Sequence, residues 1–301
     1  MKRFSALVIL CITGLAGMAQ NSKESNTLLW KISGNGLAKP SYLYGTIHML
    51  CADDAVISPN FKKAINNADE VYLEVNLDNL MEIFGALGGM KMKGDTTLED
   101  LLDPKDYARV KEYFEKSESM IPFSMLETFQ PIMAASLLSE GTSPCDNTVM
   151  MEQEIMGVAK DGGVGINGLE TMAYQAGVLD SIPYKLQAQQ LLKYIDAAAK
   201  GEDDNKEMDE LMDAYKKQDL DKLEKIMVAS DAGMSGFTDI LLYHRNQNWV
   251  IKLKKLLLKK SLVVAVGAGH LPGEKGLINL LRKEGYKVTP VENKLTKTKE
   301  I

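Results

Sequence analysis

The chain has 301 residues and a formal net charge of −6, with 45% hydrophobic and 25% charged residues. This length and composition suffice to bury a sizeable core and exclude wholesale disorder. The 41 acidic residues outnumber the 35 basic ones, which excludes nucleic acid as an expected partner because phosphate binding needs clustered positive charge. Only three histidines and three cysteines are present, so metal or nucleophile chemistry depends on very few side chains.

Residues 1–19 have the pattern of a signal peptide. Two basic residues precede an apolar run over residues 4–19, and the small residues Gly17 and Ala19 fit a cleavage site before Gln20. The run is short for a membrane span, which needs about 20 residues, and an uncleaved anchor is the alternative. We therefore expect an exported protein, periplasmic or extracellular, whose mature domain covers residues 20–301 and keeps no stable membrane span.

The first part of the mature chain alternates between strands and a helix. Strands are predicted over residues 28–32 and 41–44, and Gly45 is expected to end the second one. A short helix is predicted over residues 60–67, followed by a mostly apolar strand over residues 71–75. This alternation is typical of α/β architecture.

The middle of the chain, about residues 98–227, is predicted to be helical. Asp103 before Pro104 is a strong helix start, because a capping side chain precedes a proline at the first helical position. Further helices are predicted over residues 182–199 and, as a charged outer layer, over residues 203–227.

The last part returns to α/β alternation. A long amphipathic helix over residues 241–260 precedes the apolar run 262–266, which is expected to form a strand covered on both faces. A helix over residues 274–284, capped by Gly285, and a last strand over residues 286–291 complete the predicted fold.

Two cysteines, Cys51 and Cys145, remain after removal of the signal peptide. In an oxidising compartment an isolated pair tends to form a disulfide, and thiolate metal ligation is the alternative. A nucleophilic cysteine is not supported, because the sequence places no base beside either residue.

Two of the three histidines stand in matching contexts. The sequences Gly-Thr-Ile-His, ending at His48, and Gly-Ala-Gly-His, ending at His270, each follow a predicted strand. Residues just past the carboxyl ends of such strands face the ligand crevice of an α/β sheet. Two neutral imidazoles there could bind one metal ion, and a pair of structural, hydrogen-bonded histidines is the alternative. We do not expect His244 to reach this site, so any metal must also use carboxylates, which favours manganese over a thiolate-bound zinc.

Two glutamates also lie near predicted strand ends. Glu74 has apolar neighbours, and a buried carboxylate there could be a metal ligand or a general base, unless the strand leaves it in water. Glu170 follows a short strand predicted over residues 164–166, and ordinary charge at a helix N-terminus is its alternative role.

Arg245 is the remaining candidate for chemistry. It lies on the helix predicted over residues 241–260 and could pair with an active-site carboxylate, a substrate carboxylate or a developing oxyanion. A solvated arginine is equally compatible with the sequence.

Other mechanisms lack their motifs. The chain has no P-loop, H-E-x-x-H, G-x-S-x-G or C-x-x-C sequence. The G-x-G-x-x-G match over residues 163–168 lies after a helix and contains the strand itself, so the context for dinucleotide binding fails. Phosphate or nucleotide binding is therefore not expected, and no residue is predicted to bind an organic cofactor.

Several of these motifs together resemble the TraB/GumN family, which includes the Tiki metalloproteases. The resemblance covers nearly the whole mature chain in the expected order, and its most specific part is the paired G-x-x-H with a glutamate after the first. The motifs that carry it are Ser41-Tyr42-Leu43-Tyr44-Gly45-Thr46-Ile47-His48, Tyr72-Leu73-Glu74-Val75, Gly168-Leu169-Glu170-Thr171 with Gln175, Arg245-Asn246 with Trp249, and Val266-Gly267-Ala268-Gly269-His270-Leu271-Pro272-Gly273.

The resemblance implies a fold of two related α/β halves with a central helical insertion, in which the strands meet at a shared crevice. It implies that His48, Glu74, Arg245 and His270 converge there, whereas Glu170 matches a motif of the bacterial branch. It also implies a metal-dependent peptidase that uses manganese or cobalt, with zinc possible, and it favours a disulfide between the two cysteines.

We therefore expect an exported metal-dependent hydrolase that acts on a peptide or protein. His48, His270 and Glu74 would hold the metal, and Glu74, Arg245 and Glu170 would be the catalytic residues. The alternative is a non-catalytic envelope protein that binds a peptide, haem or a polysaccharide precursor. A third hypothesis makes the helical middle region an interaction module.

Overall fold

The structure is a computed structural model of the whole chain. It describes residues 26–80, 82, 85, 87–117, 121–139, 145, 147–200, 205–229 and 237–295. The predicted signal peptide over residues 1–19 lies outside the described residues, so it stays a prediction. Among the helices of the described ranges, none has the length and apolar character that a membrane span needs.

A six-stranded mixed sheet forms the centre of the fold, with the strand order β6-β4-β7-β2-β1-β8. The first four strands of this order run parallel, whereas β1 is antiparallel to both β2 and β8. The predicted α/β class is therefore confirmed. The strands are β1 (Leu29–Ser33), β2 (Ser41–Thr46), β4 (Glu70–Leu73), β6 (Gly165–Gly168), β7 (Leu262–Gly267) and β8 (Lys287–Pro290).

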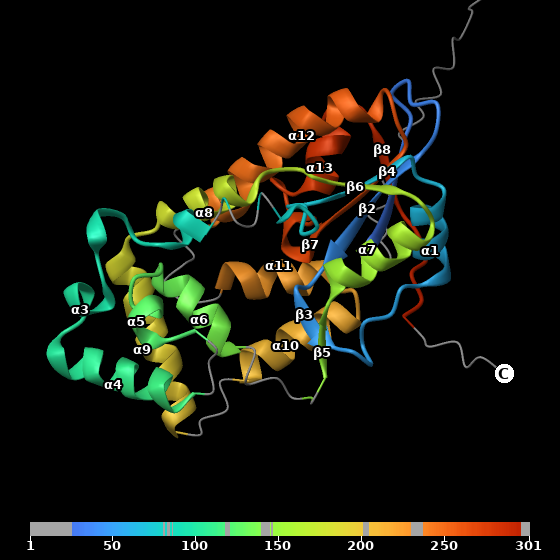
Figure 1. Cartoon of the computed structure of the whole chain (residues 1–301). Helices are drawn as coiled ribbons and strands as arrows, with labels where there is room; N and C mark the ends of the chain where they lie inside the picture. Colours follow the sequence, from blue (N-terminus) through green and yellow to red (C-terminus); the bar gives the residue numbers. More distant parts are fainter. Residues whose placement is uncertain are drawn as a thin grey trace, which may run out of the picture.

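Helices cover both faces of this sheet (Figure 1). α1 (Pro59–Asn66) packs beside α7 (Met151–Asp161) on one face, and α12 (His244–Leu257) packs beside α13 (Leu277–Lys283) on the other. The apolar run of β7 is buried throughout, as expected for a strand with helices on both faces.

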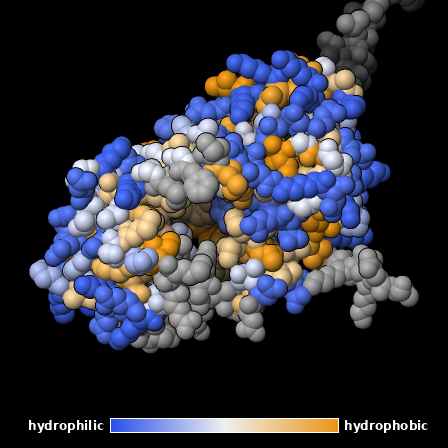
Figure 2. All heavy atoms as spheres, viewed as in Figure 1, coloured by the Kyte–Doolittle hydropathy of each residue, from blue (hydrophilic) through white to orange (hydrophobic). Residues whose placement is uncertain are grey.

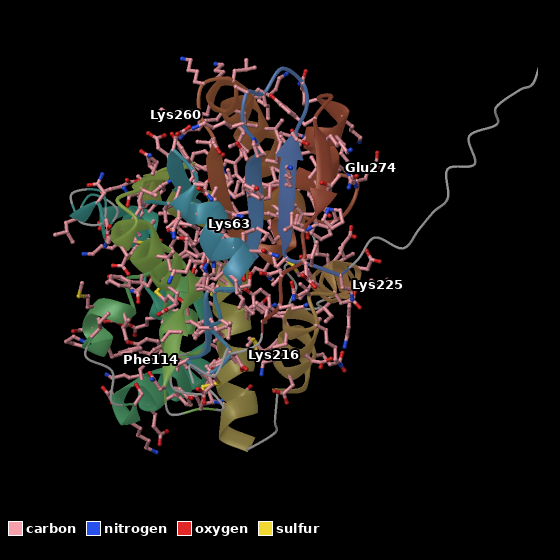
Figure 3. The ribbon with its side chains drawn as sticks, turned by 90° about the vertical axis from the view of Figure 1, so that its right-hand side faces the viewer. Lys63, Phe114, Lys216, Lys225, Lys260 and Glu274 are labelled. Carbon is pink, nitrogen blue, oxygen red and sulfur yellow. A yellow bond between two sulfur atoms is a disulfide. The ribbon has the colours of Figure 1, made fainter. Side chains whose placement is uncertain are left out.

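The middle of the chain forms a helical lobe with a core of its own, which confirms its predicted helical character. The lobe comprises α3 (Leu98–Leu101), α4 (Pro104–Lys116), α5 (Phe123–Leu126), α6 (Pro131–Ser139) and α9 (Tyr184–Lys200). Its apolar cluster is separate from the cluster around the sheet. Figure 3 shows Phe114 of this lobe at the opposite end of the molecule from Lys260, just before β7.

Asp103 begins α4 as predicted, because its side chain accepts hydrogen bonds from the backbone N–H groups of Lys105 and Asp106. Other helices of the described chain lie between the lobe and the sheet (Figure 1). They are α8 (Met172–Asp180), α10 (Asn205–Lys216) and α11 (Leu220–Ala229).

Several predicted boundaries are wrong, each for a local reason. Gly45 does not end β2, because it stays in the parallel ladder opposite Val266. Within the charged stretch predicted over residues 203–227, the described residues from 205 onwards form two helices rather than one, separated where Gln218 takes a positive φ of 55°. The long helix begins only at His244, after a π-helical turn over Asp239–Tyr243.

A small two-stranded ribbon was not predicted from the sequence. β3 (Met49–Cys51) pairs antiparallel with β5 (Thr148–Met150), directly after His48 and directly before α7. A disulfide joins Cys51 to Cys145 at the far end of this ribbon and confirms the expected pairing. The ribbon therefore ties the end of β2 to the start of α7.

Candidate active site

The carboxyl ends of the parallel strands meet at one edge of the sheet, where a ligand crevice is expected. His48 follows β2, Glu74 follows β4, and His270 follows β7. All three line one cavity of about 540 Å³, together with Arg245 from α12. The structure thus brings together the four residues whose convergence the family resemblance implies.

Arg245 links the carboxylates of this site. Its Nη2 donates to Glu74 Oε2 at 2.5 Å and to Glu170 Oε1 at 2.5 Å, and its Nε donates to the same Glu170 oxygen at 2.9 Å. Its Nη1 donates to the Leu241 carbonyl at 2.9 Å and faces His270 Nε2 at 3.3 Å. Arg245 is only 7% exposed, which excludes a solvated arginine. Its contacts show pairing with two carboxylates of the site.

Glu74 is held as an ionised carboxylate. Its Oε1 accepts from the Gly267 N–H at 2.8 Å, and its Oε2 accepts from Arg245 and, at 3.1 Å, from Gln175. Burial raises the pKa of a carboxyl group, but three influences outweigh it here and lower the pKa of Glu74 to about 2: the charge of His270, which is protonated at the low pH where Glu74 titrates, the charge of Arg245, and the Gly267 N–H. The carboxylate therefore keeps its negative charge at neutral pH.

Glu170 supports Arg245 from another side. Besides its bonds from Arg245, it accepts from Trp249 Nε1 at 3.0 Å. Burial raises the pKa of Glu170 although the Arg245 hydrogen bond opposes it. Glu170 is not among the described residues that line the cavity, so its contacts are those of a residue that positions Arg245.

His270 is buried and its tautomer is fixed by its neighbours. The Asn246 amide nitrogen donates to the carbonyls of His270 and Lys275, so its oxygen faces His270 Nδ1 at 2.7 Å. An amide oxygen only accepts, which assigns the proton to Nδ1 and leaves the lone pair on Nε2. Burial lowers the pKa of His270 to about 4, so the imidazole is neutral at physiological pH.

His48 stands on the more exposed side of the cavity. Its Nδ1 lies 3.0 Å from Glu152 Oε1, which leaves Nε2 as the free ring nitrogen. This hydrogen bond is the largest influence on His48 and raises its pKa, against the effect of burial. The third histidine, His244, is exposed and does not line the cavity, in agreement with the expectation that it stays outside the site.

The side of the cavity away from the sheet is apolar. Figure 2 shows a hollow with hydrophobic residues at its rim between the helical lobe and the sheet. In this wall Met227 packs directly over Gly269, where an added Cβ would lie 2.2 Å from its sulfur. Glycine therefore lets α11 close over the end of β7. The apolar wall consists of Met133, Val178, Leu179, Leu211, Leu223, Met227, Leu241 and Leu242.

Two potential metal donors of the cavity lie close enough together to share one ion. His270 Nε2 lies 3.7 Å from Glu74 Oε1, a separation that two bonds of about 2.1 Å to one ion can span. His48, whose Nδ1 faces Glu152, adds a second imidazole to the lining of the same cavity. Across the described ranges, however, no three His, Cys, Asp or Glu side chains are grouped closely enough to hold a metal.

Sequence reasoning missed Glu152 in this site. It lies in the first turn of α7, where acidic residues are common because the helix dipole favours them. Its partner His48 is 104 residues away, so no local signal distinguishes it. Asn246 was found only as part of the family resemblance, and nothing in its local pattern shows that it orients His270.

The comparisons with known proteins point to one family. A sequence model of the TraB/PrgY/gumN family matches residues 28–290. Metalloprotease TIKI2 of Xenopus tropicalis is 24% identical over 345 residues, which cover 95% of this chain and 64% of that protein.

Metalloprotease TIKI1 of Danio rerio is 24% identical over 327 residues, which cover 91% of this chain and 65% of that protein. Metalloprotease TIKI1 of Homo sapiens is 24% identical over 315 residues, which cover 88% of this chain and 62% of that protein. The chain thus spans less than two thirds of the length of these curated relatives. No solved structure matches the chain.

Proposed function

The chain belongs to the TraB/PrgY/gumN family, and from this premise we propose that it is an exported, metal-dependent hydrolase that cleaves peptides. The observation that carries the proposal is the meeting of His48, His270 and an ionised Glu74 on one cavity. His270 carries its lone pair on Nε2, where it accepts a hydrogen bond from Arg245, and the Nδ1 of His48 faces Glu152, which leaves its Nε2 for a ligand. The relatives are named metalloproteases, which supports the same reaction class.

His48, His270 and Glu74 would hold the divalent ion. When bound, the ion would lower the pKa of a water molecule and polarise the carbonyl of the substrate. Manganese or cobalt fits this nitrogen and oxygen donor set, and zinc can also use it. Because Cys51 and Cys145 form a disulfide, neither is available as a thiolate ligand of the metal.

Glu74 is better suited to bind the ion than to act as a base. A carboxylate with a pKa of about 2 takes up a proton poorly at neutral pH. Its bonds from Gly267 and Arg245 also hold both oxygens in fixed positions. Of the two roles predicted for Glu74, we therefore propose that of the ligand.

Arg245 balances the charge of Glu74 and fixes its orientation. All five of its N–H groups face an acceptor in the described structure. Its predicted role in stabilising an oxyanion needs the Nη1–H that now faces His270. Glu170 in turn holds the guanidinium against Glu74 and is proposed as a positioning residue.

The apolar wall supports a peptide with an apolar side chain beside the cleaved bond, because such a side chain gains burial there. The disulfide supports export, since disulfides persist in oxidising compartments. The substrate itself is proposed only as a peptide or protein.

The test is a cleavage assay on the protein lacking residues 1–19, stripped of metal and then supplied with Mn²⁺. Peptides with apolar residues should be cut only after Mn²⁺ addition, and His48→Ala or His270→Ala should abolish both metal binding and cleavage. His244→Ala is the matched control and should keep full activity. Stoichiometric metal retained in the His48→Ala/His270→Ala double variant would overturn the proposal.

The same apolar wall is compatible with the alternative of a non-catalytic binding protein. Such a protein would bind apolar peptides in the cavity with no cleavage at any metal concentration. A haem-binding protein would show a Soret band on titration, lost on substitution of His48.

A further inference from the structure

The buried side chain of Glu152 has no role in the function proposed above. Glu152 is 7% exposed and stands in the first turn of α7. Its Oε1 accepts from the Thr46 hydroxyl at 2.8 Å and faces His48 Nδ1 at 3.0 Å. Its Oε2 is buried and has no hydrogen-bond partner within the described part of the chain.

This arrangement is costly for the fold. A buried carboxylate oxygen without a donor loses its hydration, and no hydrogen bond within the protein replaces it. Thr46 and His48 both use the other oxygen, so the burial of Oε2 is not offset by these contacts. The charge is therefore better explained by what Oε1 does for His48 than by a contribution to stability.

The effect on His48 follows from the chemistry of the two groups. A carboxylate only accepts hydrogen bonds, so His48 must carry its proton on Nδ1 to form this bond. The lone pair then lies on Nε2, the ring nitrogen that does not face Glu152, and His48 lines the cavity. Acceptors at the second nitrogen commonly fix metal-binding histidines in this way.

The surrounding backbone holds both partners in register. In the ribbon, Met49 pairs with Met150 and Cys51 pairs with Thr148. His48 immediately precedes this ribbon, and Glu152 follows it by two residues. The bond between them therefore closes the end of the ribbon opposite the disulfide.

We propose that Glu152 is the positioning residue for His48, which it holds in the Nδ1–H tautomer with Nε2 free on the cavity. This proposal rests on the proposed function, because only a metal-binding role requires that the Nε2 of His48 carry a lone pair. The hydrogen bond and the tautomer exist without any metal, so they can be measured separately.

The first measurement is nitrogen NMR of histidine-labelled, metal-free protein, above the pH range in which imidazole titrates. With only three histidines, His48→Ala and His244→Ala variants assign the spectrum. We expect His48 to show a protonated Nδ1 in the wild type and in Glu152→Gln, whose amide oxygen still accepts. In Glu152→Ala the Nε2–H form, which solvated imidazole favours, should predominate.

The second measurement is Mn²⁺ binding to the same metal-stripped proteins. Glu152→Ala should bind Mn²⁺ about 10- to 100-fold more weakly than the wild type, the usual effect of losing such a partner. Glu154→Ala is the matched control, because Glu154 is an exposed acid in the same helical turn. It should change neither the tautomer nor the affinity.

The outcomes separate the two proposals. An Nε2–H tautomer of His48 in the wild type, which needs no variant to detect, would overturn the role of Glu152. An unchanged tautomer in Glu152→Ala would do the same. The expected tautomers together with no Mn²⁺ binding by the wild type would support the positioning role and overturn the proposed metal-dependent function.

Discussion

Arg245 places a positive charge between two buried carboxylates, Glu74 and Glu170. In a buried network the cost of removing one partner is dominated by the charges that are left unpaired. The stability of the site therefore depends on Arg245 more than on a surface arginine or lysine of the same charge.

We expect Arg245→Met to lower the free energy of unfolding by about 3–5 kcal/mol, because both carboxylates lose their partner. Urea unfolding of the two proteins measures the difference. Lys254→Met is the control, since the ion pair of Lys254 with Glu284 is half exposed and should contribute about 0–1 kcal/mol. Equal losses in the two variants would contradict the buried network.

The lowered pKa of His270 predicts a pH-dependent stability. The folded value is about 4, whereas an unfolded histidine titrates near 6.5. Between these values the unfolded chain binds a proton that the folded chain does not bind, so stability is lost as the pH falls from about 6.5 towards 4. The total loss from this group is about 3 kcal/mol.

Urea unfolding of metal-free protein across this pH range tests the prediction. His270→Gln should remove the loss in this window, and His244→Gln should keep it. The raised pKa of His48 acts in the opposite direction, with stability present at low pH and lost as the pH rises, but it is common to all three proteins. The same pH slope in His270→Gln and the wild type would show that His270 is not the group responsible.

At the residue scale, the sequence predicts those site residues whose signal is local. His48 and His270 each follow an apolar strand at a glycine, so one short segment contains both the position and the donor. Glu152 has no such signal, because its role depends on a contact 104 residues away. Arg245 is intermediate, since the sequence predicts its helix but not whether its charge is buried.

The ribbon of β3 and β5 is the element that the disulfide stabilises most directly. Cys51 and Cys145 are separated by 94 residues, so the bond closes a long loop in the unfolded chain. Next to it, the Ala52 N–H donates to the Asn147 carbonyl at 3.0 Å. This amide reports on local opening of the ribbon.

Replacing both cysteines by serine should lower the free energy of unfolding by about 2–4 kcal/mol. Amide hydrogen exchange should also accelerate at Ala52 more than in the centre of β7. A reducing agent should reproduce both effects in the wild type and change nothing in the double variant, which is the control. Unchanged exchange at Ala52 would show that the ribbon holds together without the disulfide.

At the element scale, prediction succeeds where a pattern is long enough to repeat. The buried run of β7 and the capped start of α4 are both found close to their predicted places. The strands β3 and β5 have three residues each and are mostly half-buried, so neither shows an alternation. Gly45 was wrongly expected to end β2. Glycine is required there within the strand, because a Cβ at this position would lie 3.1 Å from Ala268.

At the scale of the whole molecule, the described residues form two apolar clusters, one around the sheet and one in the helical lobe. Leu253 of α12 belongs to the first and Leu191 of α9 to the second, and both are fully buried. The cavity lies between them, since its wall includes His270 from the sheet side and Met133 from the lobe. The relative stability of the two clusters therefore affects the binding site.

We expect the lobe to open without the sheet, because its core is the smaller cluster and separate cores commonly form separate cooperative units. Leu191→Ala and Leu253→Ala should each cost about 2–5 kcal/mol within their own cluster. Hydrogen exchange should then accelerate in α4 and α9 for Leu191→Ala while β7 stays protected, whereas Leu253→Ala should accelerate exchange in β7.

The lobe also supplies part of the apolar wall but none of the proposed metal ligands. Under the proposed function, Leu191→Ala should therefore raise KM for an apolar peptide and leave the affinity for Mn²⁺ unchanged. Leu253 packs in the cluster that holds the strand ends in place, so Leu253→Ala should weaken Mn²⁺ binding as well. Equal acceleration of exchange throughout the chain in both variants would show that the two clusters unfold as one unit.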